Sequence, residues 1–258
     1  MSVRETTCQV VYNVEVASGI YEMKLVTDRV DDILGGQFVN IKLPTSDTLL
    51  RRPFCLCDFD SSDNTFVICY AVVGKGTETL SQVKTGEILK ATLPLGNGWD
   101  PRGKYSKIML VGGGMGSAVL PAVARRSEGV DCVCYLGFAD KSKVVLEDRL
   151  RGLCSEVVVA TDNGSYGRKG FVTDVVAEDI IKSGVEAVFC CGPEVMYKAL
   201  KRALAKVDIP VYISLEQRMG CGIGACLVCN CMIERDGKQG YYRVCKDGPV
   251  FELSEVVL

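Results

Sequence analysis

The sequence predicts a multi-domain β plus α/β protein with an antiparallel β-barrel, a parallel-sheet α/β domain and a small C-terminal cysteine-rich subdomain. Short apolar stretches separated by turn residues fill roughly the first hundred positions. Strand-like and helix-like stretches then alternate, which is typical of a parallel sheet covered by helices on both faces. A loop with four cysteines in the thirteen residues 219–231 follows. We place the domain boundaries at 1–101, 102–214 and 215–258.

The first domain is expected to be all β. Its apolar stretches contain β-branched and aromatic residues, and turn residues such as Gly, Pro, Asp and Asn separate them. Stretches of this length and spacing favour a small antiparallel barrel. The expected strands cover residues 8–17, 20–27, 37–44, 51–59, 65–73 and 86–95.

In the second domain, strands and helices are expected in alternation. The strands cover 107–114, 130–138, 156–162, 186–193 and 211–216, and the helices cover 117–126, 144–152, 173–183 and 194–207. After about residue 216 the sequence pattern changes: a loop rich in Gly and Cys is expected, followed by a hairpin over 231–245. The chain therefore has three parts.

Composition limits the classes of function. The 258 residues are 48% apolar, and 30 Lys plus Arg against 32 Asp plus Glu give a net charge of -2. Because no basic run is present, neither nucleic acid nor a membrane is an expected partner. The N-terminus lacks the apolar core of a signal peptide, so we expect a cytoplasmic protein. In a reducing cytosol, the 14 cysteines serve as free thiols, metal ligands or redox groups.

The cysteine loop is the strongest signal in the sequence. Its spacing, C-x4-C-x2-C followed by a cysteine after fifteen more residues, is that of plant-type 2Fe–2S ferredoxins. Glycines in the loop let the backbone approach a cluster and direct N–H groups at its sulfurs. Zinc is the alternative, although zinc sites favour two short C-x2-C knuckles. The absence of histidine excludes a Rieske centre. The expected cluster ligands are Cys221, Cys226, Cys229 and Cys245, with Cys231 left to packing.

Two stretches of the first domain suggest a flavin site. In RRPFC, Arg52 can clamp a pyrophosphate and Phe54 can lie against an isoalloxazine ring. The stretch YAVVGKGT from Tyr70 to Thr77 ends a strand in a glycine turn, whose N–H groups and Thr77 hydroxyl can hold phosphate or ribityl oxygens. An ordinary strand edge and an ordinary hairpin turn remain the alternatives.

The α/β domain contains two nucleotide signals. In VGGGMGS, the glycines at 112, 113, 114 and 116 form a turn between a strand and a helix, the geometry that presents backbone donors to a pyrophosphate. The stretch CCGPE places Cys191, Gly192 and Pro193 at the carboxyl edge of another strand, where open α/β sheets bind ligands. Cys191 is our candidate catalytic residue. After the second strand, Asp140 favours NAD, although two lysines beside it can tolerate a 2′-phosphate.

Together these motifs resemble a known family. The stretches that carry this resemblance are RRPF, VVGKGT, PLGNGW, GGGMG, TDNGSYGRKGFVT, CGPEVM and SLEQRMGCGIGACLVC. The chain is similar to the electron transfer subunits of the two-protein, NAD-linked dihydroorotate dehydrogenases, a branch of the ferredoxin reductase superfamily. The resemblance covers essentially the whole chain. It implies that the flavin contacts comprise Arg52, Pro53, Phe54, Cys55, Tyr70, Ala71, Gly76 and Thr77. Departures are Cys55 in place of Ser, Ala71 in place of Arg and Val119 in place of Pro.

The resemblance also implies a function. It implies that FAD binds in the barrel and that the 2Fe–2S cluster binds to the cysteine loop. It also implies that NAD(H) binds at Gly112, Gly113, Gly114, Gly116, Gly192 and Pro193. These groups would connect NAD to the flavin of an FMN-containing dihydroorotate dehydrogenase catalytic subunit. The expected assembly is a hetero-oligomer with two copies of each subunit, acting in pyrimidine (UMP) biosynthesis. Another reductase subunit of the superfamily, linked to sulfide dehydrogenase or hydrogenase, is the alternative enzyme. A zinc-binding or redox-sensing adaptor is the alternative outside enzymes.

Overall fold

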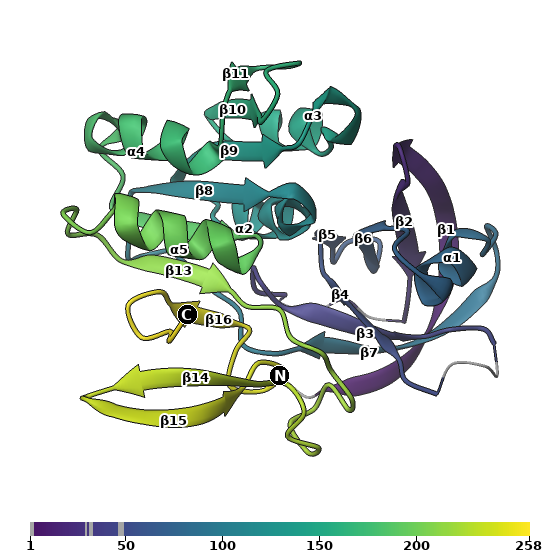
Figure 1. The fold of residues 1–258 in the computed structure, drawn as a ribbon. Helices are drawn as coiled ribbons and strands as arrows, with labels where there is room; N and C mark the ends of the chain where they lie inside the picture. Colours follow the sequence, from purple (N-terminus) through teal and green to yellow (C-terminus); the bar gives the residue numbers. More distant parts are fainter. Residues whose placement is uncertain (1–2, 29, 31–32, 46–48) are drawn as a thin grey trace.

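The computed structural model describes residues 3–28, 30, 33–45 and 49–258. It contains two seven-stranded sheets side by side and a two-stranded C-terminal hairpin (Figure 1). The predicted fold class of an antiparallel β-barrel followed by a parallel α/β unit and a cysteine-rich segment is confirmed. Among the described residues, every helix is too short or too polar to cross a membrane.

The first sheet is entirely antiparallel and has the order β4-β3-β7-β1-β2-β6-β5. The sheet curls until β4 approaches β6, where the rings of Phe54 and Tyr70 lie 5.5 Å apart. In β7, residues alternate between exposed and buried positions, as expected for a strand with one face on a core. The strands of this first sheet are β1 (Arg4–Ala17), β2 (Ile20–Val26), β3 (Phe38–Lys42), β4 (Arg52–Cys55), β5 (Asp58–Asp60), β6 (Thr65–Ala71) and β7 (Ile88–Leu95).

The glycine stretch after β6 differs from the expected turn. Residues 72–74 turn the chain, and a short helix, α1 (Lys75–Ser81), follows. Gly76 and Thr77 lie in its first turn, and the Thr77 hydroxyl accepts the backbone N–H of Val73 at 2.9 Å. Leu80 is fully buried in the barrel core, so tertiary packing favours a helix where local glycines suggested only a turn.

The second sheet has the order β11-β10-β9-β8-β12-β13-β16, parallel except for β16. β9 is buried at seven of its eight positions, because helices cover both faces of the sheet. The strands of this second sheet are β8 (Lys107–Gly113), β9 (Asp131–Phe138), β10 (Glu156–Thr161), β11 (Arg168–Lys169), β12 (Ala187–Cys191), β13 (Val211–Ser214) and β16 (Val250–Glu252).

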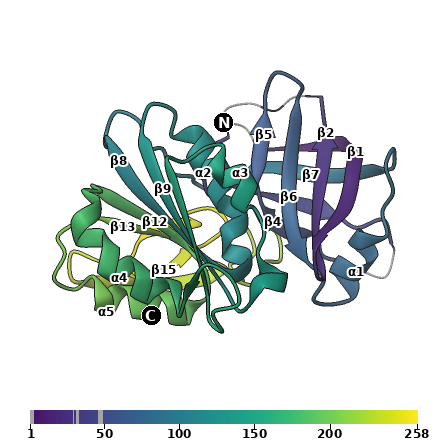
Figure 2. The same cartoon turned by 90° about the horizontal axis from the view of Figure 1, so that it is seen from above.

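Alternate residues of β8 determine which helices lie on which face. Met109 and Val111 share a core with α4 and α5, whereas Ile108 and Leu110 pack with α2 and α3 (Figure 2). The expected helix after β8 begins as a 3-10 turn over 114–119 and continues as α2. The helices are α2 (Leu120–Arg126), α3 (Glu147–Arg151), α4 (Val172–Ser183) and α5 (Glu194–Ala203), with a further 3-10 turn, η2, at Lys141–Lys143.

The C-terminal segment returns to the second sheet. The loop of residues 215–229 leads to the hairpin of β14 (Asn230–Arg235) and β15 (Lys238–Arg243). β16 then pairs antiparallel with β13. The segment thus lies against both larger units, and the isolated bridge between Asn97 and Pro249 joins its end to the barrel.

Candidate functional sites

The four predicted cluster cysteines come together around the loop that precedes β14. Cys221, Cys226 and Cys229 lie in the loop, and Cys245 reaches them from the segment after β15. The backbone N–H of Cys221 donates to Cys226 Sγ, and that of Cys226 donates to Cys221 Sγ, both at 3.4 Å. The N–H of Cys245 donates to Cys229 Sγ at 3.4 Å. The thiols therefore form two neighbouring pairs, Cys221 with Cys226 and Cys229 with Cys245.

This arrangement fits a two-iron cluster. Within the described residues, no three Cys, Asp, Glu or His side chains converge on a single metal position. A 2Fe–2S cluster needs four thiolates, two for each iron, and the two pairs supply this donor set. A structural zinc ion needs all four ligands around one point. The four thiols therefore match the donor set of a 2Fe–2S cluster.

Backbone N–H groups surround the loop thiols. Cys221 Sγ accepts N–H groups from Ile223, Ala225 and Cys226 at 3.3–3.4 Å. Burial alone would raise the pKa of Cys221, but hydrogen bonds from Ile223, Cys226 and Ala225 outweigh it and lower the pKa to about 6. The loop therefore stabilises negative charge on sulfur.

Positive φ angles at two glycines allow this backbone path. Gly222 has φ +72° and Gly224 has φ +83°, a region that costs side chains about 1–2 kcal/mol. The N–H of Gly224 donates to Cys245 Sγ at 3.1 Å. Cys231 Sγ lies 3.5 Å from the Tyr242 carbonyl in the hairpin, which agrees with its expected packing role.

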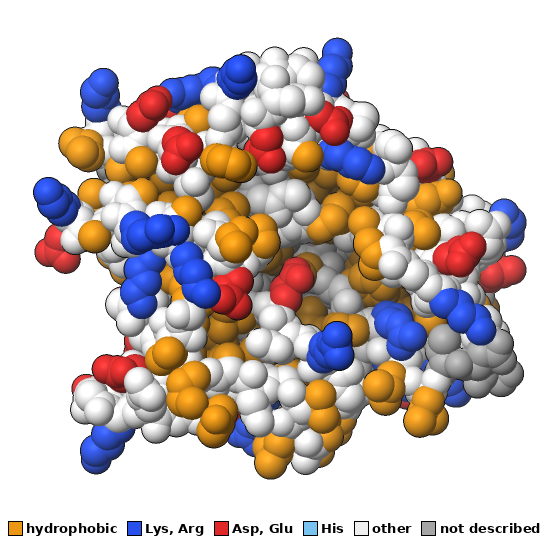
Figure 3. Space-filling view, in the orientation of Figure 1, with side chains coloured by type: hydrophobic (Ala, Val, Ile, Leu, Met, Phe, Trp, Pro, Cys, Tyr) orange, Lys and Arg blue, Asp and Glu red, His pale blue; other side chains and the backbone are white. Residues whose placement is uncertain are grey.

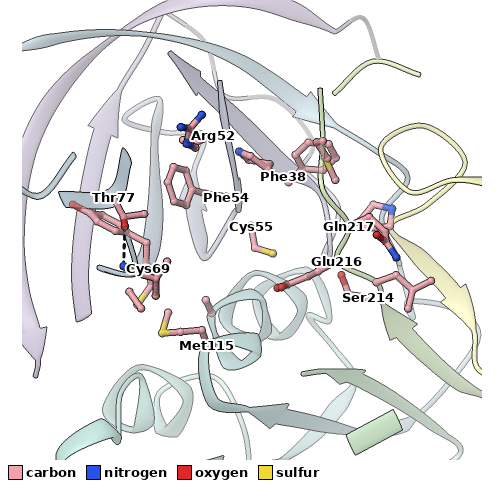
Figure 4. A pocket seen from close by; sticks show the side chains of 18 residues that line it. Phe38, Arg52, Phe54, Cys55, Cys69, Thr77, Met115, Ser214, Glu216 and Gln217 are labelled. Carbon is pink, nitrogen blue, oxygen red and sulfur yellow. Dashed lines mark hydrogen bonds between the residues drawn. The ribbon is translucent and has the colours of Figure 1, made fainter. Parts of the chain in front are cut away.

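The predicted flavin residues line a cleft between the barrel and the α/β unit. A cavity of about 360 Å³ lies there, and the hollow is visible in the middle of the face in Figure 3. Figure 4 shows Arg52, Phe54, Cys55 and Thr77 on its barrel side. Of the eight expected flavin residues, seven line the cavity: Arg52, Pro53, Phe54, Cys55, Tyr70, Ala71 and Thr77.

The eighth residue, Gly76, lies behind Arg52. A Cβ atom added to Gly76 would lie 2.7 Å from Arg52 Nε, so the glycine makes room for the guanidinium. Arg52 Nη1 donates to the Leu50 carbonyl at 2.6 Å, and the Tyr70 hydroxyl donates to Asn13 Oδ1 at 2.9 Å. Aromatic walls with a fixed guanidinium suit a planar ring system that carries phosphate.

The opposite wall contains residues that the motifs did not reveal. Met115 and Ala118 come from the glycine turn, and Ser214, Leu215, Glu216, Gln217 and Met219 come from the segment before the cysteine loop. Glu216 reaches toward the cavity near Cys55 (Figure 4). Burial raises the pKa of its carboxyl. The stretch SLEQRM contains no phosphate or aromatic pattern, so only the folded chain identifies it as a cavity wall.

The predicted nucleotide residues divide into two groups. Gly113, Gly114 and Pro193 line a second cavity of about 630 Å³ at the carboxyl edge of the second sheet. Gly112, Gly116 and Gly192 lie outside its lining, and each allows a close contact. A Cβ atom added to Gly112 would lie 2.5 Å from Ser117 Oγ, and one added to Gly116 would lie 2.4 Å from the Cys191 carbonyl oxygen. A Cβ atom added to Gly192 would lie 2.4 Å from Met196 Cε.

Cys191 occupies the end of β12, as the sequence indicated. It is fully buried, and its Sγ lies 3.8 Å from the Ser214 carbonyl. Burial raises the pKa of this thiol well above its ordinary value. Cys191 is absent from the lining of both cavities, and its carbonyl contacts Gly116 of the glycine turn.

Comparisons with known proteins agree with this geometry. Residues 216–257 match the model of the iron-sulfur cluster binding domain of dihydroorotate dehydrogenase B. The chain is 44% identical to the dihydroorotate dehydrogenase B (NAD(+)) electron transfer subunit of Bacillus pumilus, over 96% of each chain. It is 39% identical to the subunit of the same name from Clostridium acetobutylicum, over 100% of this chain and 99% of that one.

Solved structures show the same architecture. An NADH-dependent reduced ferredoxin-NADP oxidoreductase structure matches with a TM-score of 0.85 and 28% identity, over 97% of this chain and 89% of that chain. The ferredoxin reductase of carbazole 1,9a-dioxygenase matches with a TM-score of 0.72 and 23% identity, over 83% and 69% of the chains, and shares the fold. The predicted family is thereby confirmed: this chain belongs to the dihydroorotate dehydrogenase B (NAD(+)) electron transfer subunits.

Proposed function

We propose that this chain is the cytoplasmic electron transfer subunit that connects NAD with an FMN-containing dihydroorotate dehydrogenase catalytic subunit in UMP biosynthesis. One observation carries the proposal: a single segment serves both the flavin cavity and the cysteine loop. Ser214 to Gln217 and Met219 line the cavity, and Cys221 follows two residues later. A flavin in the cavity and a cluster on the thiols would therefore be close neighbours.

FAD fits the first cavity through this chain's own residues. Arg52 would hold the pyrophosphate, and Phe54 and Tyr70 would supply the aromatic surroundings of the ring. Thr77 offers its hydroxyl at the same wall. When bound, FAD supplies two-electron exchange with a nicotinamide and one-electron exchange with a 2Fe–2S cluster.

NAD(H) fits the second cavity, where Gly113, Gly114 and Pro193 present backbone to the ligand. Met115 lines both cavities, so the nucleotide and flavin sites adjoin each other. Cys191 would act from behind the glycine turn, where its carbonyl contacts Gly116. The residue positions Gly116 and stays shielded from bulk water, which keeps the thiol neutral.

The cluster loop would face the catalytic subunit. Three apolar side chains project around it: Ile223, Leu227 and Val228 are 52%, 57% and 58% exposed. Cys226 is itself exposed, so a partner seated on this surface would approach the cluster closely. Exposed apolar groups beside a redox centre favour a protein partner, which buries them and excludes water. We propose an assembly with two copies of each subunit.

An anaerobic titration of the purified chain with NADH, followed by visible absorption and EPR, tests the internal route. We expect flavin bleaching followed by a reduced 2Fe–2S signal, with NADPH less effective. A colourless protein, or a coloured one inert to NADH, would contradict the proposal.

A mixing experiment tests the partner. The purified FMN-containing catalytic subunit is added with dihydroorotate and NAD, and NADH formation is followed with wild type and with a Leu227→Glu, Val228→Glu variant. We expect coupled turnover only with wild type, while the variant keeps its own reduction by NADH. Equal coupled activity would exclude this surface as the docking site.

A further inference from the structure

Three thiols gather on the face of the second sheet that packs with α2 and α3. Cys132 and Cys134 belong to β9, and Cys154 lies three residues after α3. Cys154 packs against the buried core that contains Cys132 and Cys134, and the N–H of the next residue, Ser155, donates to the Cys132 carbonyl at 2.9 Å. The thiol of Cys154 interacts electrostatically with the thiols of Cys134 and Cys132. No proposed cofactor site uses these residues.

The members of this thiol cluster differ in access to solvent. Cys132 and Cys134 are 2% and 0% exposed, whereas Cys154 is only partly buried. Cys134 also has a fixed position, because β9 pairs with β8 on one side and β10 on the other. A reagent from solvent therefore meets Cys154 before it can reach the buried Cys134.

Electrostatics distinguish Cys154 from the other cysteines outside the cluster loop. The neighbouring Cys134 thiol lowers the pKa of Cys154, although burial and the charge of Asp131 oppose it. Lys107 pairs with Asp131 at 3.3 Å and offsets part of that charge. Burial raises the pKa of Cys134 well above its ordinary value. A partly exposed thiol of lowered pKa beside a second thiol is typical of redox-sensitive cysteine pairs.

We propose that Cys154 and Cys134 are a peroxide-sensitive dithiol. The Cys154 thiolate attacks one oxygen of hydrogen peroxide, the O–O bond breaks, and a sulfenic acid and hydroxide form. The Cys134 thiol then attacks the Cys154 sulfur, which forms the S–S bond and releases the sulfenic oxygen as water. The two thiols lose two electrons and two protons in total, and one peroxide becomes two water molecules.

The position of the pair separates this chemistry from electron transfer. Gly137, Phe138 and Ala139 line the nucleotide cavity at the carboxyl end of β9, whereas Cys132 and Cys134 lie in the first half of the strand. The N–H of Cys154 donates to the Leu150 carbonyl at 2.8 Å, which fixes Cys154 to the end of α3. A disulfide would therefore lock α3 to β9 and leave the cofactor contacts in place.

Peptide mapping tests the pair directly. Trypsin separates the cysteines, because Cys132 and Cys134 fall in the fragment SEGVDCVCYLGFADK, residues 127–141, and Cys154 in GLCSEVVVATDNGSYGR, residues 152–168. The holoprotein is treated with hydrogen peroxide, free thiols are alkylated under denaturing conditions, and the digest is analysed by mass spectrometry. We expect a cross-linked pair of these fragments that dithiothreitol removes.

Three variants identify the partners. Cys154→Ser and Cys134→Ser should lose the cross-link, whereas Cys132→Ser should keep it, and circular dichroism verifies that each variant is folded. The buried Cys57 and Cys69, which are 0% and 5% exposed, provide an internal control that should stay reduced. A cross-link that survives Cys134→Ser, an unmodified Cys154, or oxidation of Cys154 only to sulfinic acid would each overturn the proposal.

Discussion

The guanidinium of Arg149 and the carboxylate of Glu22 lie 2.8 Å apart across the boundary between the α/β unit and the barrel. Arg149 also reaches Asp58 at 3.3 Å, and both acids are buried, with exposed fractions of 8% for Glu22 and 9% for Asp58. The flavin cavity lies between these two units. A buried ion network thus fixes the walls of the cofactor cleft.

Replacing Arg149 should therefore destabilise the protein. Arg149→Met leaves Glu22 buried without its cation, so we expect the free energy of unfolding to fall by about 3 kcal/mol. Arg151→Met is the matched control, because the Arg151 side chain is 54% exposed and its one ion pair among the described residues is with Glu147 of the same helix. We therefore expect a loss below about 1 kcal/mol. Chemical denaturation measures both, and equal losses would contradict a special role for Arg149.

The cysteine loop predicts different results for two neighbouring cysteines. Cys226→Ala removes one thiolate of a pair, so we expect loss of iron and of the reduced 2Fe–2S EPR signal. Cys231→Ala should retain both, because Cys231 contacts the hairpin carbonyl of Tyr242. Iron analysis and EPR of the two variants decide the ligand set. Iron loss in Cys231→Ala, or full iron in Cys226→Ala, would refute the assignment.

Gly224 is expected to influence the reduction potential of the cluster. Gly224→Ala introduces a side chain at φ +83° and disturbs the N–H that donates to Cys245 Sγ. Because hydrogen bonds to cluster sulfurs favour the reduced state, we expect a more negative potential in an EPR redox titration. Gly237→Ala is the control, since Gly237 has φ +72° and open space around it. An unchanged potential in Gly224→Ala would rule out this contribution.

Arg52 and Arg51 provide a matched test of the flavin site. Arg52 lines the cavity, whereas Arg51 bonds Thr92 at 3.1 Å and pairs with Glu5. A charge-assisted contact contributes about 1.5–3 kcal/mol, so Arg52→Ala should weaken FAD binding roughly tenfold to hundredfold. Arg51→Ala should change it little. Fluorescence titration of the flavin-free protein with FAD measures both, and a similar affinity in the two variants would argue against the pyrophosphate contact.

Asp140 should determine the choice of coenzyme. It directly follows Ala139 of the nucleotide cavity, and its Oδ1 accepts the N–H of Ser142 at 2.7 Å. Asp140→Ala removes the acceptor for a ribose 2′-OH and a charge that repels a 2′-phosphate. We expect the ratio of kcat/KM for NADPH to that for NADH to rise in steady-state assays. Asp148→Ala, an exposed acid of α3, should leave the ratio unchanged.

The sequence by itself determined the local features of this protein. The spacing of Cys221, Cys226 and Cys229 defines a loop within a few residues, and strand and helix periods depend on near neighbours. The alternation over 107–216 predicted the parallel sheet because a parallel connection requires a crossover element. The glycine turn after β8 and the Arg-Pro-Phe strand end were also readable from short stretches.

Only the tertiary structure decided which distant segments meet. It made a helix of the residues around Gly76, because Leu80 fills the barrel core, and it joined β16 to β13. It brought Glu216 into the flavin cavity and packed Cys154 against the core that contains Cys134. It also gave Gly116 a packing role against Cys191. These outcomes depend on contacts between residues far apart in the chain, which no local pattern of residue types encodes.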